Sequence, residues 1–500
     1  MNNLLLLPVV IPMFIGVILI FFVKNIRVQR AISVIGSLAL LIASVYLAFA
    51  AYESNSQVLT LELGNWQAPF GIVLVGDMLA TLLVALAGIV GLFSLLFAFQ
   101  SIGEEREKSY FYSFFFFLLT GVNGAFLTGD LFNLFVFFEV MLISSYVLIV
   151  HGGTKFQLRE SFKYMVINMV ASIFFLVGVA YIYAVTGTLN MADLAEKVGV
   201  IGQDGMLNVI AIIFLIVFAM KGAFFPLYFW LPNAYAGPPA VVTALFAALL
   251  TKVGIYSIFR SFTLIFIHDR EFTHTIILIL AGLTMIFGVL GALSQFNINR
   301  ILNFQIISQV GFMALGIGLY SPLAIAASVY YIVHDIIIKA ALFFTAGATE
   351  KVAGTSDLKK MSGLLKTHPW LGWLFFITAM SFVGIPPLSG FFGKFGLVLG
   401  GIEVGTTLAY ILVAVVLLVS LLNLLSMMRI FMKAFWGEKN DTEPKITNKQ
   451  SIGLLRPIIP LVALSIVLGL GSEPAFQYAL AIADQILDPS IYIDAVLSGK

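Results

Sequence analysis

The chain has 500 residues, of which 61% are hydrophobic and only 10% are charged, and its formal net charge is +2. This composition leaves too little polar surface for a soluble protein of such length, so the sequence indicates a polytopic membrane protein. Because the sequence has no cysteine, a disulfide framework, a thiolate metal site and a cysteine nucleophile are excluded.

Apolar runs that are long enough to cross a bilayer as helices recur along the whole sequence, each of about 17 to 25 residues. We expect fourteen spans, near residues 4–23, 31–51, 77–100, 110–128, 130–150, 163–185, 207–226, 239–261, 274–294, 301–320, 322–347, 370–399, 406–432 and 453–471. The first run has no preceding basic residue and no small-residue cleavage site, so we expect a retained helix rather than a signal peptide. The predicted fold class is all-α.

Lysine and arginine concentrate in alternate loops, which hold nineteen of the 27 basic residues. These basic loops lie near residues 24–30, 106–108, 155–163, 300, 351–366 and 429–456. The opposite loops and the C-terminal tail hold only Lys197, Arg260, Arg270 and Lys500. Since basic loops favour the cytoplasmic side, both termini are predicted to lie outside. The stretch "GEEREKS" (103–109) and residues 437–450 are predicted to be solvated connectors.

A second group of ionisable residues stands inside the predicted spans. It comprises Glu139, Lys221, Lys252, His334, Asp335, Lys339 and Lys394. A charge at the centre of a bilayer costs at least ~2.5 to 3.5 kcal/mol on insertion scales, so these residues require partners or a water-filled cavity. We interpret six of them, all except Asp335, as a candidate proton relay.

A structural alternative stands beside that interpretation, because long lysine side chains can reach the interface or join two helices. Asp335 precedes Lys339 by four residues, and it could simply hold that lysine on the same helix face. His334 could be an ordinary packed histidine. Lys221, Lys252 and Glu139 have no such partner within their own spans.

Two of the predicted spans are interrupted by helix-breaking residues. The expected breaks lie at Pro226 in the seventh span and at Gly384, Pro386 and Pro387 in the twelfth. A proline frees backbone carbonyls, which are tolerated in a membrane only where protein or water satisfies them. Each break has a lysine nearby, Lys221 and Lys394 respectively.

Broken helices five spans apart are typical of inverted repeats that meet at a site within the membrane. We therefore expect two inverted five-helix repeats, spans four to eight and nine to thirteen. The predicted organisation is residues 1–105 for spans one to three, 106–262 and 263–436 for the two repeats, and 437–500 for a cytoplasmic connector, the last span and an external tail.

Four motifs in this order resemble a known family. They are "GDLFNLFVFFEV" (129–140), "KGAFFPLYFWLPNAYAGPPAVVTALFAALLTKVGIYSIFR" (221–260), "HDIIIKAALFFTAGA" (334–348) and "PPLSGFFGKF" (386–395). The chain is similar to the antiporter-like subunits shared by Mrp-type multisubunit Na⁺/H⁺ antiporters and the membrane arm of respiratory NADH:quinone oxidoreductase. The resemblance implies that Glu139, Lys221, Lys252, His334, Lys339 and Lys394 carry protons through two half-channels.

Within the family, the pattern favours the D-type subunits of Mrp antiporters, because Lys394 stands where the respiratory M-type subunit usually has glutamate. The resemblance implies a transporter rather than an enzyme, other small and large subunits as partners, H⁺ and Na⁺ as transported ions, and a prokaryotic cell membrane as location. The sequence has no glycine-rich phosphate loop and no haem or zinc ligand spacing, so no cofactor and no metal site are expected, and no nucleic-acid partner. A proton-pumping subunit of a respiratory complex is the alternative, and six aligned ionisable residues disfavour a purely structural scaffold.

Overall fold

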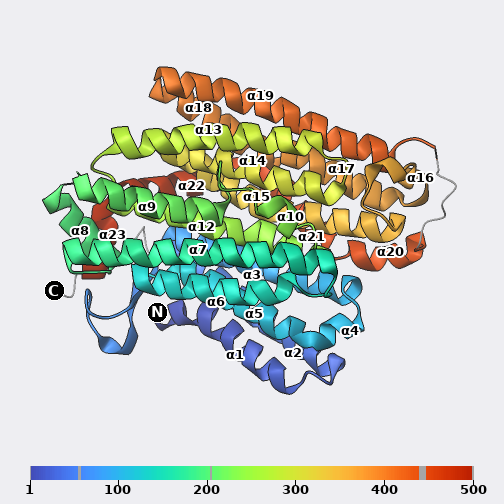
Figure 1. The fold of residues 1–500 in the computed structure, drawn as a ribbon, viewed down its shortest axis with the longest axis horizontal. Coiled ribbons are helices and arrows are strands. Elements are labelled where there is room, and N and C mark those ends of the chain that lie inside the picture. Colours follow the sequence, from blue (N-terminus) through green and yellow to red (C-terminus); the bar gives the residue numbers. More distant parts are fainter. Residues whose placement is uncertain (1, 54–57, 203–204, 439–445, 498–500) are drawn as a thin grey trace.

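The computed structural model describes residues 2–53, 58–202, 205–438 and 446–497, which form long, roughly parallel helices (Figure 1). Among the basic residues of the charge count, Lys439, Lys445 and Lys500 lie outside the described residues. The same holds for part of the predicted connector at residues 437–450.

The spans are formed by the following helices. They are η1 (Asn2–Leu6) with α1 (Leu7–Phe21), α2 (Ile26–Glu53), α3 (Met78–Ser101), α4 (Glu104–Arg106) with η3 (Glu107–Phe111) and α5 (Tyr112–Leu127), α6 (Leu131–Ile149), α7 (Lys155–Thr186), α9 (Gly205–Gly222), α11 (Ala240–Leu245) with η4 (Phe246–Leu250), α12 (Thr251–Arg260) and η5 (Ser261–Ile265), α13 (Arg270–Ser294), α14 (Ile298–Leu319), α15 (Pro322–Ala353), α17 (Pro369–Val383) with α18 (Ser389–Val404), α19 (Thr407–Ile430) with η7 (Phe431–Phe435), and α21 (Ile458–Leu470) with α22 (Ser472–Leu487).

Shorter elements connect these spans. They are β1 (Leu59–Glu62), η2 (Leu63–Asn65), β2 (Val73–Gly76), α8 (Met191–Ile201), α10 (Leu231–Ala234), η6 (Leu358–Lys360), α16 (Leu364–Thr367), α20 (Asn448–Leu455) and α23 (Pro489–Leu497). The strands β1 and β2 pair antiparallel in a small sheet.

The predicted all-α membrane fold is confirmed, with the β1–β2 hairpin as a small departure from it. Over the described ranges, 12 helices are long and apolar enough to cross a membrane, and α21 with α22, bent by 82°, makes up to 13. The helices α17 and α18 together occupy the twelfth predicted span, and neither is long enough by itself. Each of the fourteen predicted positions is therefore helical.

The core of the bundle is formed by the α11–η5 span, α14 and α15. Their most apolar windows are 100%, 94% and 89% buried, whereas those of α2 and α19 are 33% and 28% buried. Charged side chains on α12 and α15 are thus enclosed by protein, and α2 and α19 expose their apolar side chains at the periphery.

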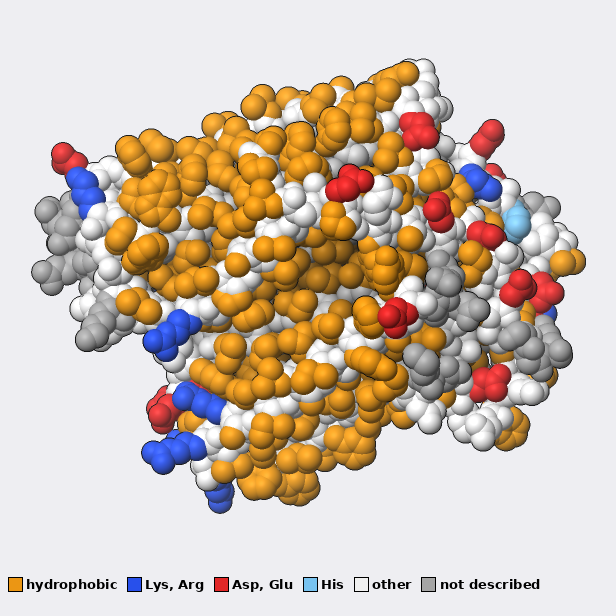
Figure 2. Space-filling view, turned by 180° about the vertical axis from the view of Figure 1, so that it is seen from behind, with side chains coloured by type: hydrophobic (Ala, Val, Ile, Leu, Met, Phe, Trp, Pro, Cys, Tyr) orange, Lys and Arg blue, Asp and Glu red, His pale blue; other side chains and the backbone are white. Residues whose placement is uncertain are grey.

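The two ends of the bundle differ in charge. Figure 1 places α4, α16 and α20 at one end and α8 and α23 at the other, with both chain termini toward the latter. In Figure 2, Lys and Arg side chains gather mainly toward one end of the apolar face and Asp and Glu side chains toward the other. We call these the basic end (loops around Arg106, Lys155, Lys359 and Lys366) and the acidic end (around Glu196, Glu403, Glu473 and Asp488).

The two predicted repeats share a local structure at their first loops. Asp130 caps the N-terminus of α6 and forms an isolated bridge with Asn190, and Asn297 caps α14 and forms an isolated bridge with Asp357. The first bridge lies beside α8 and the second beside η6, and therefore at the acidic and the basic end respectively. Equivalent features at opposite ends support an inverted relationship.

A matched pair of glycines also supports the repeats. On α5 and on α13, two glycines three residues apart face the next helix so closely that an added Cβ would clash with it. The pairs and the residues that they face are Gly121 and Gly124 with Met141 and Phe137, and Gly288 and Gly291 with Ser308 and Phe304. The exact domain boundaries stay a prediction.

Candidate functional site

The first cluster of predicted site residues joins α6, α7 and α9. The Ser172 hydroxyl donates a hydrogen bond to the Glu139 carboxylate, and the Lys221 ammonium group donates one to the Ser172 oxygen over 3.3 Å. The Lys221 ammonium also lies 5.4 Å from the centre of the Phe138 ring, a favourable cation–π geometry. Glu139 and Lys221 are thus brought together, but through a serine that the sequence did not single out.

The break in the seventh span lies directly after Lys221. Helix α9 ends at Gly222, four residues before Pro226, and turns connect it to α10. Two of the freed carbonyls are satisfied by Phe224 N–H to Ala219 at 2.9 Å and by the Trp230 indole N–H to Met220 at 3.2 Å. The break therefore leaves a lysine at the end of a half-helix, where the negative end of the helix dipole favours a cation.

Helix α12 packs against this half-helix at very short range. An added Cβ on Gly254 would lie 2.7 Å from the backbone nitrogen of Gly222. A larger residue at position 254 would therefore separate α12 from α9. This contact places the helical turn that carries Lys252 beside the turn that carries Lys221.

The centre of the site is an ion pair between α12 and α15. The Lys252 ammonium lies 2.5 Å from the Asp335 carboxylate, and the two side chains are 1% and 0% exposed. Lys252 also donates to the Ala247 carbonyl at 2.6 Å, within the π-helical turn η4. Such turns are frequent at functional sites because they change the backbone hydrogen-bond pattern.

Asp335 is therefore not the counter-ion of Lys339 that its spacing suggested. The buried Lys339 ammonium has no hydrogen-bond partner among the described residues, and it lies 4.4 Å from the centre of the Phe382 ring of α17. Asp335 and Lys339 do lie on the same helix, four residues apart, as their spacing predicted. The Asp335 carboxylate, however, pairs with Lys252 of the neighbouring helix α12.

The second broken span surrounds Lys394. Its ammonium group donates to the carbonyls of Val383 at 2.8 Å and Phe382 at 3.4 Å, where α17 ends. The chain then passes through Gly384, which has a φ of 93°, a conformation that favours glycine. Lys394 thus satisfies carbonyls that the predicted Gly384–Pro387 break sets free.

His334 faces the same break from α15. Its Nδ1 atom lies 2.7 Å from the Ser389 hydroxyl, while its Nε2 atom has no partner among the described residues. The His334 and Lys394 side chains both approach the break. The ammonium groups of Lys339 and Lys394 both lie near the Phe382 ring, and that of Lys394 is 5.9 Å from the ring centre. Five of the six predicted residues therefore lie on α9, α12, α15 and α18, and Glu139 reaches them through Ser172.

A row of polar side chains, which sequence reasoning missed, leads from α15 toward the basic end. The Tyr331 hydroxyl donates to the Gln309 side chain, Gln309 lies 3.5 Å from Gln305, and Gln305 donates to the Ser426 hydroxyl at 2.7 Å. The Lys394 ammonium lies 6.0 Å from the centre of the Tyr331 ring. Two glutamines at i, i+4 inside the apolar α14 are the signal that could have identified this row.

Two charged residues that the sequence assigned to loops are buried, and one of them, Glu107, was predicted to be solvated. Arg260 was counted with a loop in the charge pattern, although the predicted span 239–261 includes it; it lies on α12, is 6% exposed and pairs with Asp77, which caps α3. Glu107 belongs to the predicted solvated connector, yet it is 0% exposed and binds Arg30 at 2.7 Å. The prediction for Glu107 was wrong because this residue lies in η3, within the helical span Glu104–Leu127, where it faces Arg30 of α2.

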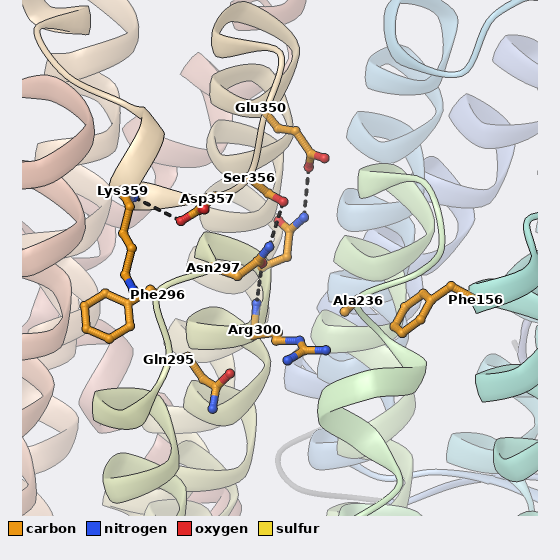
Figure 3. A pocket seen from close by; sticks show the side chains of 11 residues that line it. Phe156, Ala236, Gln295, Phe296, Asn297, Arg300, Glu350, Ser356, Asp357 and Lys359 are labelled. Carbon is orange, nitrogen blue, oxygen red and sulfur yellow. Dashed lines mark hydrogen bonds between the residues drawn. The ribbon is translucent and has the colours of Figure 1, made fainter. Parts of the chain in front are cut away.

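A polar cavity of about 460 Å³ opens at the basic end, where the two repeats meet (Figure 3). Its lining includes Asn297, Arg300, Glu350 and Lys359 of the second repeat together with Phe156 of the first. None of the six predicted relay residues lines it. It is therefore separate from the buried clusters.

We expect Gly390→Ala to disrupt the second break. An added Cβ would lie 2.1 Å from the Ser381 carbonyl oxygen and 2.9 Å from His334 Nε2, so α18 must shift. The expected cost is about 1–3 kcal/mol of stability, seen as a lower melting temperature of the purified complex, together with slower transport. Gly199→Ala on α8, where the nearest atom is 3.4 Å away, is the control and should change neither. A normal melting temperature in Gly390→Ala would show that the break is loosely packed.

Broken helices with buried lysines, joined through an enclosed carboxylate–lysine pair, define a class of membrane proteins that move ions along ionisable side chains. Residues 128–422 match the family described as "NADH:quinone oxidoreductase/Mrp antiporter, TM", and the chain belongs to this family. All six predicted relay residues lie within the matched region.

Relatives extend the match over almost the whole chain. A protein of Alkalihalophilus pseudofirmus, named as the D-type subunit of an Na⁺/H⁺ antiporter, is 65% identical over 498 residues, which cover 99% of this chain and 100% of that protein. The protein of the same name from Bacillus subtilis is 50% identical over 497 residues, with 99% and 100% coverage. A chain in the solved "Structure of Mrp complex from Dietzia sp. DQ12-45-1b" has a TM-score of 0.91 and 31% identity, with 99% of both chains covered.

Proposed function

We propose that this chain is the D-type subunit of a multisubunit Na⁺/H⁺ antiporter and that it carries protons along Glu139, Lys221, Lys252, His334, Lys339 and Lys394. The names of its relatives support this proposal, since these relatives match the chain over almost its whole length at high identity. The buried Lys252–Asp335 pair carries it most strongly, because it connects the lysine of the first repeat's α12 to the helix that bears His334 and Lys339.

Charge coupling provides a physical basis for the relay. Two charges ~7 Å apart at an effective dielectric constant of ~20 interact by ~2.4 kcal/mol. A proton that arrives at one lysine therefore changes the protonation of the next. In the structure Asp335 pairs with Lys252, although Lys339 lies four residues away on the same helix. In the proposed cycle, the carboxylate moves between these two lysines and stabilises whichever is protonated.

The proposal includes the cellular setting. The chain acts in the cell membrane of a prokaryote, as a transporter subunit rather than an enzyme, and in a complex with other small and large subunits. The relatives' subunit names and the solved Mrp complex support the hetero-oligomer. The basic end faces the cytoplasm, which places both termini outside, and the difference in charge between the two ends supports this orientation.

A respiratory proton-pumping subunit is the second candidate, because the matched family includes such proteins. The lysine at position 394 argues for the antiporter, since the respiratory M-type subunit is expected to have glutamate there.

The test uses the complete complex that contains this chain, expressed in cells that lack their own Na⁺/H⁺ antiporters. We expect everted vesicles to lose an imposed pH gradient when Na⁺ is added, and vesicles whose complex lacks this chain to retain it. We also expect the purified complex to catalyse no reduction of quinone by NADH. NADH-dependent quinone reduction, or Na⁺ responses that do not depend on this chain, would contradict the assignment.

A further inference from the structure

Three serine hydroxyls from three helices meet at the break in the twelfth span. Ser381 belongs to α17, Ser389 to α18 and Ser465 to α21. The Ser389 and Ser465 oxygens are 2.9 Å apart, and Ser381 lies 2.7 Å from Ser465 and 3.2 Å from Ser389. Each of these serines is at most 1% exposed. This serine cluster lies in the protein interior.

Only one of the three serines is hydrogen-bonded to the relay, as far as the described residues show. The Ser389 hydroxyl lies 2.7 Å from His334 Nδ1, and it also contacts Ser465 directly. Ser381 contacts both of the other serines, but a proton can pass directly between Ser389 and Ser465 without it. Ser465 lies on α21, beyond the matched region 128–422.

Helix α21 leads from this cluster toward the acidic end. Gly469 permits a close approach to the break, because an added Cβ would lie 2.4 Å from the Pro387 carbonyl oxygen. The Tyr330 hydroxyl, one turn from His334 on α15, donates to the Leu468 carbonyl at 2.9 Å. Just beyond the end of α21, Glu473 and its neighbour Ser472 line a cavity of about 240 Å³.

We propose that Ser389 and Ser465 form a hydroxyl pathway that carries protons between His334 and the α21 side of the acidic end, so that the last span is part of the proton route. This inference rests on the proposed function. In one step, Ser389 transfers its proton to His334 Nδ1 while it takes a proton from Ser465, and Ser465 takes one from a hydronium ion that enters from the acidic end. Each hydroxyl keeps one proton, and one proton moves in total.

The alternative explanation is structural: the serines hold three helices together, since each hydrogen bond between membrane helices contributes about 0.6 to 2 kcal/mol to their association. That role predicts similar small effects of alanine at all three positions. The Nε2 atom of the fully buried His334 has no partner among the described residues, which argues for a role in proton transfer beyond helix packing. The Nδ1 contact is the single hydrogen bond of this imidazole in the described structure, so Ser389 controls its proton.

The test measures antiport in everted vesicles for the complex with Ser389→Ala, Ser465→Ala or Ser381→Ala in this chain. We expect transport to fall on the order of a hundredfold for Ser389→Ala and Ser465→Ala, as for the loss of a positioned proton-transfer group. Ser381→Ala should stay close to wild type. Ser389→Thr keeps a hydroxyl and should restore transport. Ser328→Ala is the matched control, since this buried hydroxyl of α15 donates only to the Met313 carbonyl.

Two further readouts separate the possible outcomes. Native gels and melting temperatures should be unchanged in the alanine variants, and Ser389→Thr, which keeps the hydroxyl, should show the same slowing of transport in D₂O as wild type. Full transport in Ser389→Ala, with an active wild type, would overturn the pathway but not the antiporter assignment. Equal losses at all three serines, together with loss of assembly, would assign the cluster to helix packing and also overturn the pathway. An inactive wild type would instead contradict the proposed function.

Discussion

Replacing Asp335 by asparagine is expected to abolish Na⁺-dependent proton transport while the complex still assembles. The substitution keeps the shape of the side chain but removes the charge that stabilises the Lys252 ammonium 2.5 Å away. Removing one partner of a buried ion pair costs about 3–5 kcal/mol, and Lys252 avoids this cost by losing its proton. A lysine that stays neutral can no longer attract or repel protons on neighbouring lysines, so the two repeats become uncoupled.

The double variant Lys252→Met/Asp335→Asn separates coupling from packing. Because neither side chain is charged, the melting temperature of the purified complex should be at least that of Asp335→Asn. Transport, followed as the Na⁺-induced loss of a pH gradient in everted vesicles, should remain absent. Recovery of transport in the double variant would show that the ion pair only holds α12 and α15 together.

Replacing Lys221 by alanine, or Glu139 by glutamine, is also expected to abolish Na⁺-dependent proton transport. The two residues share the Ser172 hydroxyl, which donates to Glu139 and accepts from Lys221. Glu139 and Lys221 stand at the start of the proposed proton relay. Loss of either group removes a proton-carrying site there that no neighbouring residue can replace. Ser172→Ala should lower transport less, because the two ionisable groups remain.

Lys197→Ala is the matched control for this first cluster. Lys197 pairs with Asp193 at 3.0 Å on α8; its own side chain is 40% exposed, whereas that of Asp193 is 3% exposed. Losing this pair can lower stability, so transport is compared at equal amounts of assembled complex. The same vesicle assay should give wild-type rates for this variant. Wild-type rates in Lys221→Ala would place the lysine among residues that only satisfy the end of α9.

Prediction from sequence succeeded for features that are local along the chain. The spans followed from runs of apolar residues, and the breaks from prolines and glycines, because hydrophobic length and backbone restriction are properties of consecutive residues. The buried lysines were visible for the same reason, since a charge within an apolar run is conspicuous wherever the helix packs.

Contacts between helices were predicted less well. The spacing of Asp335 and Lys339 described one helical face, but the carboxylate binds Lys252 of α12. Similarly, Arg260 was counted with a loop, yet it lies on α12 and pairs with Asp77 at the start of α3. In each case the partner is chosen by the approach of two helices far apart in sequence.

The sequence by itself thus determined the membrane fold, the broken helices and the residues that can hold a proton. Only the tertiary structure decided which of them are connected, Glu139 with Lys221 through Ser172 and Lys252 with Asp335 directly, and that His334 contacts the Ser389 hydroxyl. The physical reason is that serine is too common in apolar helices to mark a position, whereas a hydrogen bond requires two atoms about 3 Å apart. That distance is set by helix packing and not by spacing along the chain.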